Sequence, residues 1–322
     1  MNTEELLQTL TPQVQPVQPD DTMAEAGRKA LLPEFLKVLK HEAGSRTGAD
    51  IEDVHDMRVA TRRIRSTLRL LEAYYKPKAI EPFNRQLRKT ARALGAVRDL
   101  DVMIDNLQKF AVALPAEQGG ALQPVLARLD AERAAARDDL NKALDKKTYR
   151  RFLKDFGEFL TTPGAGAQAI HPDAVQPVQV RHVLPTLIYE HLGSVRAYDA
   201  VLDGAKPETL HALRIEFKRL RYAVTLFSDV MGSSIKNYVT EIKQMQDHLG
   251  VLNDATVAQE RLTELISRLD PQTDSTAIEV LRTYIAQTDA EMQQKIATVP
   301  EVWKRFNAKT VQKHLASAIS AL

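Results

Sequence analysis

Apolar residues recur at three- and four-residue spacing along most of this 322-residue chain, and this spacing predicts helices. Alternation of apolar and polar residues, which would predict strands, is scarce. Pro and Gly punctuate the boundaries between the periodic segments. The pattern therefore predicts an all-α protein. The expected helices cover residues 23–42, 50–75, 79–114, 121–146 and 149–160, followed by 183–202, 207–230, 234–269, 276–297 and 301–319.

Two stretches rich in Pro and Gln lack this periodicity. The first covers residues 1–22 and is expected to be a flexible tail. The second covers residues 161–180 and is expected to be a linker. They divide the chain into a first helical half, residues 23–160, and a second helical half, residues 181–322.

The two halves share an ordered pair of motifs. "HDMRVATRRIRS" from His55 matches "HALRIEFKRLRY" from His211 at an offset of 156 (211 − 55), and "LGAVRDLD" from Leu94 matches "LGVLNDAT" from Leu249 at an offset of 155 (249 − 94). Two separated motifs in the same order predict an internal duplication. We therefore expect two pseudo-symmetric halves, each resembling a four-helix bundle.

The repeated His-containing motif places its cations on one side of a helix. At about 100° per residue from His55, the four arginines Arg58, Arg62, Arg65 and Arg69 fall between about 280° and 340°, whereas apolar residues such as Ile64 and Leu68 fall between about 140° and 220°. The second copy places His211, Arg214, Lys218 and Arg221 in the same arc. Arg63 and Arg219 lie off this arc, near 80°.

Net charge contributes little to this pattern, because 44 Lys and Arg residues stand against 42 Asp and Glu residues for a formal charge of +2. Attraction to a polyanion must therefore come from local segregation of charge. A solvated basic face is the ordinary alternative. Arginine at the same positions in both copies favours an anion site, and its fork of donors suits phosphate oxygens. Further candidate ligands are Lys37 and His41, then Arg85, Arg88, Lys89 and Arg92, and in the second half Lys236 and Lys243.

The histidine and cysteine content limits which disulfides, metal sites and cofactors the protein can have. The chain has no cysteine, which excludes disulfides and thiolate metal sites and fits a cytoplasmic setting. The eight histidines form no pair spaced for metal binding, so no metal or cofactor is expected. His55 and His211 stand in the first turns of their helices, where both a structural role and a phosphate contact remain open. No apolar run approaches the roughly 18 residues of a membrane span, and the first residues lack a basic segment followed by an apolar one. We therefore expect a soluble, unexported protein.

These motifs resemble the CHAD family, named for its conserved histidines in an α-helical domain. The stretches that carry the resemblance are "VHDMRVATRRIRSTLRLLE" and "LRKTARALGAVRDLDVMIDNL", then "LHALRIEFKRLRYAVTLF" and "IKQMQDHLGVLNDATVAQERL". The resemblance implies a helical module that binds inorganic polyphosphate in a basic central cleft, and in some members a location on polyphosphate granules. It implies binding roles for His55, Arg58, Arg62, Arg63, Arg65, Arg88, Arg92, His211, Arg214, Lys218, Arg219, Arg221 and Lys243. Asp247 and Gln244 depart from the basic pattern of the first half.

Two other functions compete with non-catalytic polyphosphate binding. A nucleic-acid binder would use the same cations, but single-strand binders interleave aromatic residues for base stacking, and only Tyr222 stands beside the basic positions. A phosphate-transferring enzyme would need carboxylates to hold a metal, for which Asp99 and Asp101 are the candidates. The second copy keeps only Asp254 of this pair, so we expect no enzyme.

Overall fold

The computed structural model describes residues 2–170 and 176–322, and it confirms the all-α prediction. In this part of the chain the only β structure is two isolated bridges. The first half contains α1 (Thr3–Leu10), α2 (Met23–Thr47), α3 (Ile51–Leu70), α4 (Pro77–Val112), α5 (Ala116–Gly120), α6 (Gln123–Asp145) and α7 (Lys147–Thr161). The second half contains α8 (Val180–Arg196), α9 (Pro207–Leu226), α10 (Ile235–Ser267), α11 (Ser275–Phe306) and α12 (Lys309–Ile319).

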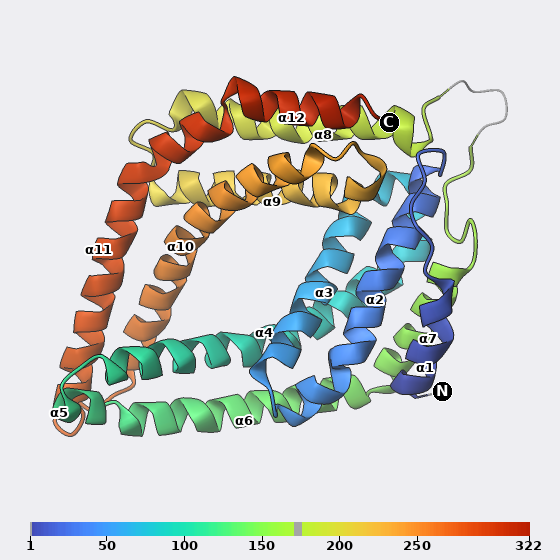
Figure 1. Ribbon diagram of the computed structural model, residues 1–322. Helices are drawn as coiled ribbons and strands as arrows, with labels where there is room; N and C mark the ends of the chain where they lie inside the picture. Colours follow the sequence, from blue (N-terminus) through green and yellow to red (C-terminus); the bar gives the residue numbers. More distant parts are fainter. Residues whose placement is uncertain (1, 171–175) are drawn as a thin grey trace.

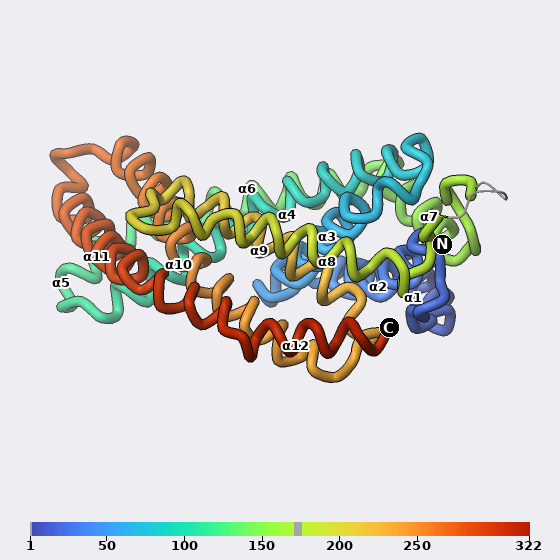
Figure 2. Tube along the Cα trace, turned by 90° about the horizontal axis from the view of Figure 1, so that it is seen from above, coloured from blue at the N-terminus to red at the C-terminus, as the bar shows by residue number. Residues whose placement is uncertain are grey.

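The helices are arranged as a four-sided frame (Figure 1). One side holds α2, α3 and α7, and the side that adjoins it holds α8, α9 and α12. The long helices α4 and α10 extend from these sides, paired with α6 and α11 respectively, and the two pairs meet at the corner occupied by α5. Viewed from above, the frame is elongated, with α11 at one end and α1 and α7 at the other (Figure 2).

Two hydrophobic clusters hold the frame together. The larger contains buried side chains from both halves, among them Phe35 and Met57 from the first and Phe217 and Phe306 from the second. The smaller lies at the far corner and joins α4 and α6 to α10 and α11. The two halves therefore share their core. The predicted duplication of the halves stays a prediction, although α3 and α9 each contain 20 residues.

An N-terminal cap and one buried apolar face determine how helix α3 forms and how it is oriented. The side chain of Asp50 caps the helix by accepting a hydrogen bond of 2.9 Å from the backbone N–H of Glu52. Met57, Ile64 and Leu68 are fully buried on one face. Each such side chain contributes about 1.5–3 kcal/mol through burial, so the rotation of α3 about its axis is fixed and the cationic arc stays outside the core.

The expectation of a flexible tail is wrong for residues 3–13. Helix α1 begins with a capping box between Asn2 and Glu5 and continues into a 3₁₀ turn, Thr11–Gln13. Leu6 and Leu10 are buried in the main core because α1 packs against α2 and α7. The helix is too short to be stable alone, so tertiary burial of these two leucines stabilises it.

The segment expected to be a linker is tied to the first half at both of its described ends. The backbone N–H of Lys76 donates to the carbonyl oxygen of Gly166 (2.8 Å), and the N–H of Met23 donates to that of Val178 (2.9 Å). Residues 171–175 of the predicted linker lie outside the described residues.

Pro300 lies inside a helix at a position where the pattern predicted a boundary. The boundary expected between residues 297 and 301 is wrong, because α11 continues through Pro300. A proline inside a helix costs about 3 kcal/mol. Val299, Trp303 and Phe306 beside it are buried, and their burial offsets that cost. Pro33, Pro82 and Pro185 likewise lie inside helices.

Candidate functional site

A cavity of about 680 Å³ lies among α3, α4, α8 and α9, and we call it the α3–α9 cavity. Its lining includes cations from both halves of the chain. Its lining residues are Arg62, Arg65, Ser66, Arg69, Leu70, Glu72, Asn84, Arg88, Leu187, Glu190, His191, Ile215, Lys218, Arg219 and Tyr222. Six of the candidate binding residues are in this set: Arg62, Arg65, Arg69, Arg88, Lys218 and Arg219.

Most of these cations lack an anionic partner. Within the described residues, no carboxylate oxygen lies within 4.0 Å of the charged atoms of Arg62, Arg65, Arg69, Arg88 or Lys218. Arg219 is the exception, because it pairs with Glu216 at 2.7 Å. Close like charges without counter-charges raise the free energy of the unliganded protein, so the cavity favours an anion.

The electrostatic strain appears most clearly at Lys218. Burial, followed by the positive charges of Arg214 and Arg62, lowers the pKa of Lys218 to about 8. Burial, followed by Arg69 and Arg88, also lowers the pKa of Arg65, which still stays charged at neutral pH. A bound anion would favour the charged form of each of these groups.

Three polar atoms of the cavity-lining residues are buried without a hydrogen-bond partner among the described residues. They are Nε of Arg62, Nε2 of His191 and Oη of Tyr222. Leaving a buried donor or acceptor unpaired costs about 1–3 kcal/mol, so each of these groups can contribute to binding a polar ligand. Burial is the largest cause of a lowered pKa at His191 and favours its neutral form.

A second group of cations surrounds Asp99 on α4. Arg261 on α10 pairs with the Asp99 carboxylate at 2.6 Å, and Arg58 on α3 lies 4.0 Å from it. Burial, followed by the opposing effects of Asp99 and the neighbouring arginines, lowers the pKa of Arg58. Arg214 stands in a comparable position 3.7 Å from Asp254. These two candidate residues are therefore already balanced in part by carboxylates, and neither lines the α3–α9 cavity.

Three candidates lie where α2 and α3 meet: Lys37 and His41 on α2, and Arg63 on α3. Lys37 and Arg63 both contact the carboxylate of Glu34, at 2.7 and 3.1 Å. His41 bonds through Nδ1 to Asp53 at 2.8 Å. The position of Arg63 agrees with its angular separation from the basic arc, and these three side chains take part in internal ion pairs.

The two motif histidines lie at the beginnings of their helices and outside the cavity lining. The Nδ1 atom of His55 is buried without a partner in the described structure, and burial, followed by the positive charge of Arg98, lowers its pKa. Nδ1 of His211 is 2.7 Å from Oδ1 of Asn253 on α10. His211 therefore joins α9 to α10.

The remaining candidates do not line the cavity. Arg85 pairs with Glu81 on its own helix at 3.2 Å. Lys89, Arg92, Lys236 and Lys243 are exposed along α4 and α10. Arg221 lies over the ring of Tyr222, with Cζ 5.8 Å from the ring centre.

Several site residues escaped the sequence reasoning. His191 on α8 has no counterpart in the repeated motif, and Ser66 and Asn84 are ordinary helix-surface residues in the sequence. Arg98 adjoins Asp99 in the motif "LGAVRDLD", which is the one signal that could have identified it. No local pattern marks Arg261.

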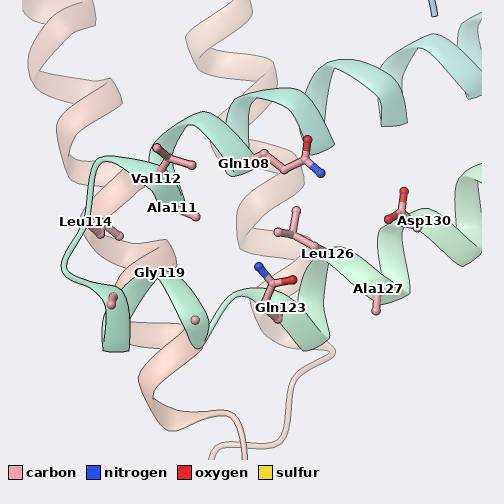
Figure 3. Close-up of a pocket in the computed structure, with 11 residues that line it drawn as sticks. Gln108, Ala111, Val112, Leu114, Gly119, Gln123, Leu126, Ala127 and Asp130 are labelled. Atoms are coloured by element: carbon pink, nitrogen blue, oxygen red, sulfur yellow. The ribbon is translucent and has the colours of Figure 1, made fainter. Parts of the chain in front are cut away.

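A further cavity of about 650 Å³ lies at the far corner, lined by residues of α4, α5 and α6 (Figure 3). Gln108, Val112, Gln123 and Asp130 lie in its wall. Lys, Arg and His are absent from its lining, so it offers no attraction to a polyanion.

Asp99 and Asp101, the carboxylates considered for metal binding, lie in different environments. Asp99 contacts arginines, whereas Asp101 is 2% exposed and lies 3.6 Å from Arg133 on α6. Burial, the largest effect, raises the pKa of Asp101. Asp101 therefore has a structural position between α4 and α6. The described residues contain no group of three or more His, Asp or Glu side chains arranged to hold a metal.

Comparison with known proteins places the chain in a family. The family model described as the CHAD domain matches residues 29–263. The chain belongs to the CHAD family. The whole lining of the α3–α9 cavity, from Arg62 to Tyr222, lies within the CHAD range. No described helix of this CHAD protein is long and apolar enough to cross a membrane.

Two curated relatives of this CHAD chain are the uncharacterized proteins MT2285 and Rv2226 of Mycobacterium tuberculosis, from strains CDC 1551 / Oshkosh and ATCC 25618 / H37Rv. Each is 28% identical over 218 residues, which cover 67% of this chain and 41% of the relative. The aligned part is thus less than half of each relative's length.

Two solved structures share the CHAD fold. The crystal structure of the CHAD domain from the plant Ricinus communis has a TM-score of 0.72 and 24% identity, over 90% of this chain and 94% of that one. PptA from Streptomyces chartreusis has a TM-score of 0.63 and 16% identity, over 89% of this chain and 100% of that one.

Proposed function

We propose that this protein binds inorganic polyphosphate without chemically altering it, and that the α3–α9 cavity is a principal contact site. The single observation that carries the proposal is the convergence of Arg62, Arg65, Arg88 and Lys218, from both halves of the chain, on one cavity without carboxylate partners. Family membership is compatible with a polyphosphate-related function. The absence of cysteine fits a cytoplasmic location, and the family resemblance implies, in some members, a location on polyphosphate granules.

A linear phosphate polymer suits the arrangement for two reasons. Arginine donates two parallel hydrogen bonds to phosphate oxygens and keeps its charge at neutral pH. The cations are also spread along α3, where the seven steps from Arg62 to Arg69 rise about 10 Å, so an extended ligand can contact several of them at once.

The competing functions have weaker support in the described structure. Base stacking would need several exposed aromatic rings, and Tyr222 is the one aromatic residue of the cavity lining. Phosphate transfer would need carboxylates able to hold a metal near the cations. Asp99 instead pairs with Arg261, and Asp101 is buried against α6.

Titration with long-chain polyphosphate at 50 and 200 mM salt tests the proposal, with orthophosphate and single-stranded DNA as competing ligands. Six cationic contacts predict a salt slope of about −4 and an affinity loss of roughly 300-fold between the two salt concentrations, by analogy with single-stranded nucleic acids. Polyphosphate chain length should be unchanged after incubation with Mg²⁺. Tighter binding of DNA than of polyphosphate, or release of orthophosphate, would contradict the proposal.

Polyphosphate affinity is expected to fall at alkaline pH because of Lys218. Its pKa is lowered to about 8, so Lys218 is charged at pH 7 and about nine-tenths neutral at pH 9. The charged form binds phosphate, and the affinity should therefore be constant below pH 7 and fall about tenfold between pH 7 and pH 9. Calorimetric titrations at pH 6, 7, 8 and 9 measure this change.

The control for this pH dependence is a pair of Lys-to-Arg variants. Lys218→Arg keeps its charge over the whole range and should bind with nearly constant affinity from pH 7 to pH 9. Lys236→Arg, at an exposed position outside the cavity lining, should show the same decrease in polyphosphate affinity between pH 7 and pH 9 as the unmodified protein. An equal fall in both variants would show that another group titrates.

A further inference from the structure

The α3–α9 cavity has a wall that a ligand made only of phosphate would not use. Leu70 from α3, Leu187 from α8 and Ile215 from α9 line it together with the ring of Tyr222. Ile215 is 37% exposed, so its side chain is accessible from the cavity. This apolar wall comes from three different helices, so it is a feature of the cavity and does not belong to any one helix face.

Two carboxylates also line the cavity. Glu72 follows the C-terminal end of α3, and Glu190 lies on α8. Burial and, second, the charge of Glu190 raise the pKa of Tyr74, which places Glu190 near the 3₁₀ turn that contains both Glu72 and Tyr74. Both carboxylates would repel a phosphate chain, but they can accept hydrogen bonds from hydroxyl, amino or ring N–H groups.

The cavity lining therefore combines cations, carboxylates and apolar side chains. Arg62 and Lys218 interact closely enough that the charge of Arg62 helps to lower the pKa of Lys218. Glu72 and Glu190 can accept hydrogen bonds from neutral donors. The volume of about 680 Å³ lies within the range of small-molecule sites, which combine apolar walls with a few polar groups that fix orientation.

From this arrangement we infer that the α3–α9 cavity binds nucleoside polyphosphates, with the phosphates on Arg62, Arg65, Arg88 and Lys218 and the nucleoside against Ile215 and Tyr222. The ribose hydroxyls and the amino or ring N–H groups of the base donate to Glu72 or Glu190. The inference deepens the proposed function, since it relies on the same cations for the phosphates.

The test compares ATP and GTP with inorganic tripolyphosphate by calorimetric titration of the full chain in EDTA. All three ligands offer a triphosphate, and only the nucleotides offer a base and a ribose. We expect at least one nucleotide to bind tenfold or more tightly than tripolyphosphate. The inference is overturned if both nucleotides bind no more tightly than tripolyphosphate.

Two variants separate the contacts of the nucleoside from those of the phosphates. Ile215→Ser should lower nucleotide affinity about fivefold or more and change tripolyphosphate affinity less than twofold. Glu190→Gln should lower nucleotide affinity and raise tripolyphosphate affinity, because it removes a negative charge. Val251→Ser, at a 41% exposed position on α10 outside the cavity lining, is the matched control and should change neither.

The outcomes also separate this inference from the proposed function. Binding of long-chain polyphosphate without a preference for nucleotides over tripolyphosphate would leave the proposed function standing and overturn the inference. Nucleotide binding without binding of long-chain polyphosphate would support the inference and overturn the proposed function. Failure of all the anions to bind would overturn both.

Discussion

Replacing four cavity cations together is expected to abolish measurable polyphosphate binding while the helices remain folded. The variant combines Arg62→Ala, Arg65→Ala, Arg88→Ala and Lys218→Ala. Hydrogen bonds to charged groups contribute about 1.5–3 kcal/mol each, so the loss of four should weaken binding at least 100-fold even when the contributions are not additive. Calorimetric titration measures the affinity, and circular dichroism measures the helical content.

Helical content should be retained because none of the four side chains has a carboxylate partner within the described structure. The loss of mutual repulsion should stabilise the folded protein slightly. A matched variant removes the same charge from the exposed face of α7 through Lys147→Ala, Arg150→Ala, Arg151→Ala and Lys154→Ala. If both variants lost affinity equally, net charge and not the α3–α9 cavity would control binding.

Shortening Leu107 to alanine is expected to destabilise the frame strongly. Leu107 is fully buried in the cluster that joins α4 and α6 to α10 and α11. In the same cluster the rings of Phe110 and Tyr284 lie 4.6 Å apart. A buried Leu-to-Ala change removes apolar contacts and leaves a cavity, so Leu107→Ala should lower the free energy of unfolding by about 2–5 kcal/mol. Urea unfolding followed by circular dichroism measures the change.

Val112→Ala is the control for this experiment. Val112 lies on the same helix but is 87% exposed, so its truncation should change the free energy of unfolding by less than about 0.5 kcal/mol. The Leu107 cluster shares no residue with the lining of the α3–α9 cavity. Leu107→Ala should therefore keep polyphosphate affinity within about twofold when the protein is folded. Equal stability of the two variants would show that the corner cluster does not hold the frame.

Sequence reasoning was most successful where one helix alone decides the answer. The buried face of Ile64 and Leu68 follows from their spacing, and the structure buries both fully. The angular position of Arg63, off the basic arc, agrees with its contact to Glu34 on α2. Both results depend on rotation about one helix axis, which the sequence specifies directly.

Sequence reasoning was less successful where packing against a neighbouring helix determines the position of a side chain or the extent of a helix. Arg85, Arg88 and Arg92 share one face of α4, yet Arg88 alone of the three lines the cavity. Residues 1–22 were predicted to be a flexible tail because they are rich in Pro and Gln and lack sustained periodicity, yet the leucines of α1 are buried by α2 and α7. Pro300 predicted a helix end, and the packing of Trp303 and Phe306 maintains α11 through it.

By itself the sequence determined an all-helical chain in which most of the cations of α3 and α9 lie on one side of each helix, because hydrophobic periodicity fixes which face of each helix turns to the core. Only the tertiary structure decided which of these cations share a cavity, which are balanced by carboxylates, and that His191, Ile215 and Tyr222 stand beside them. The physical reason is that periodicity orients a helix about its own axis, whereas the identity of its neighbours depends on the packing of segments more than a hundred residues apart.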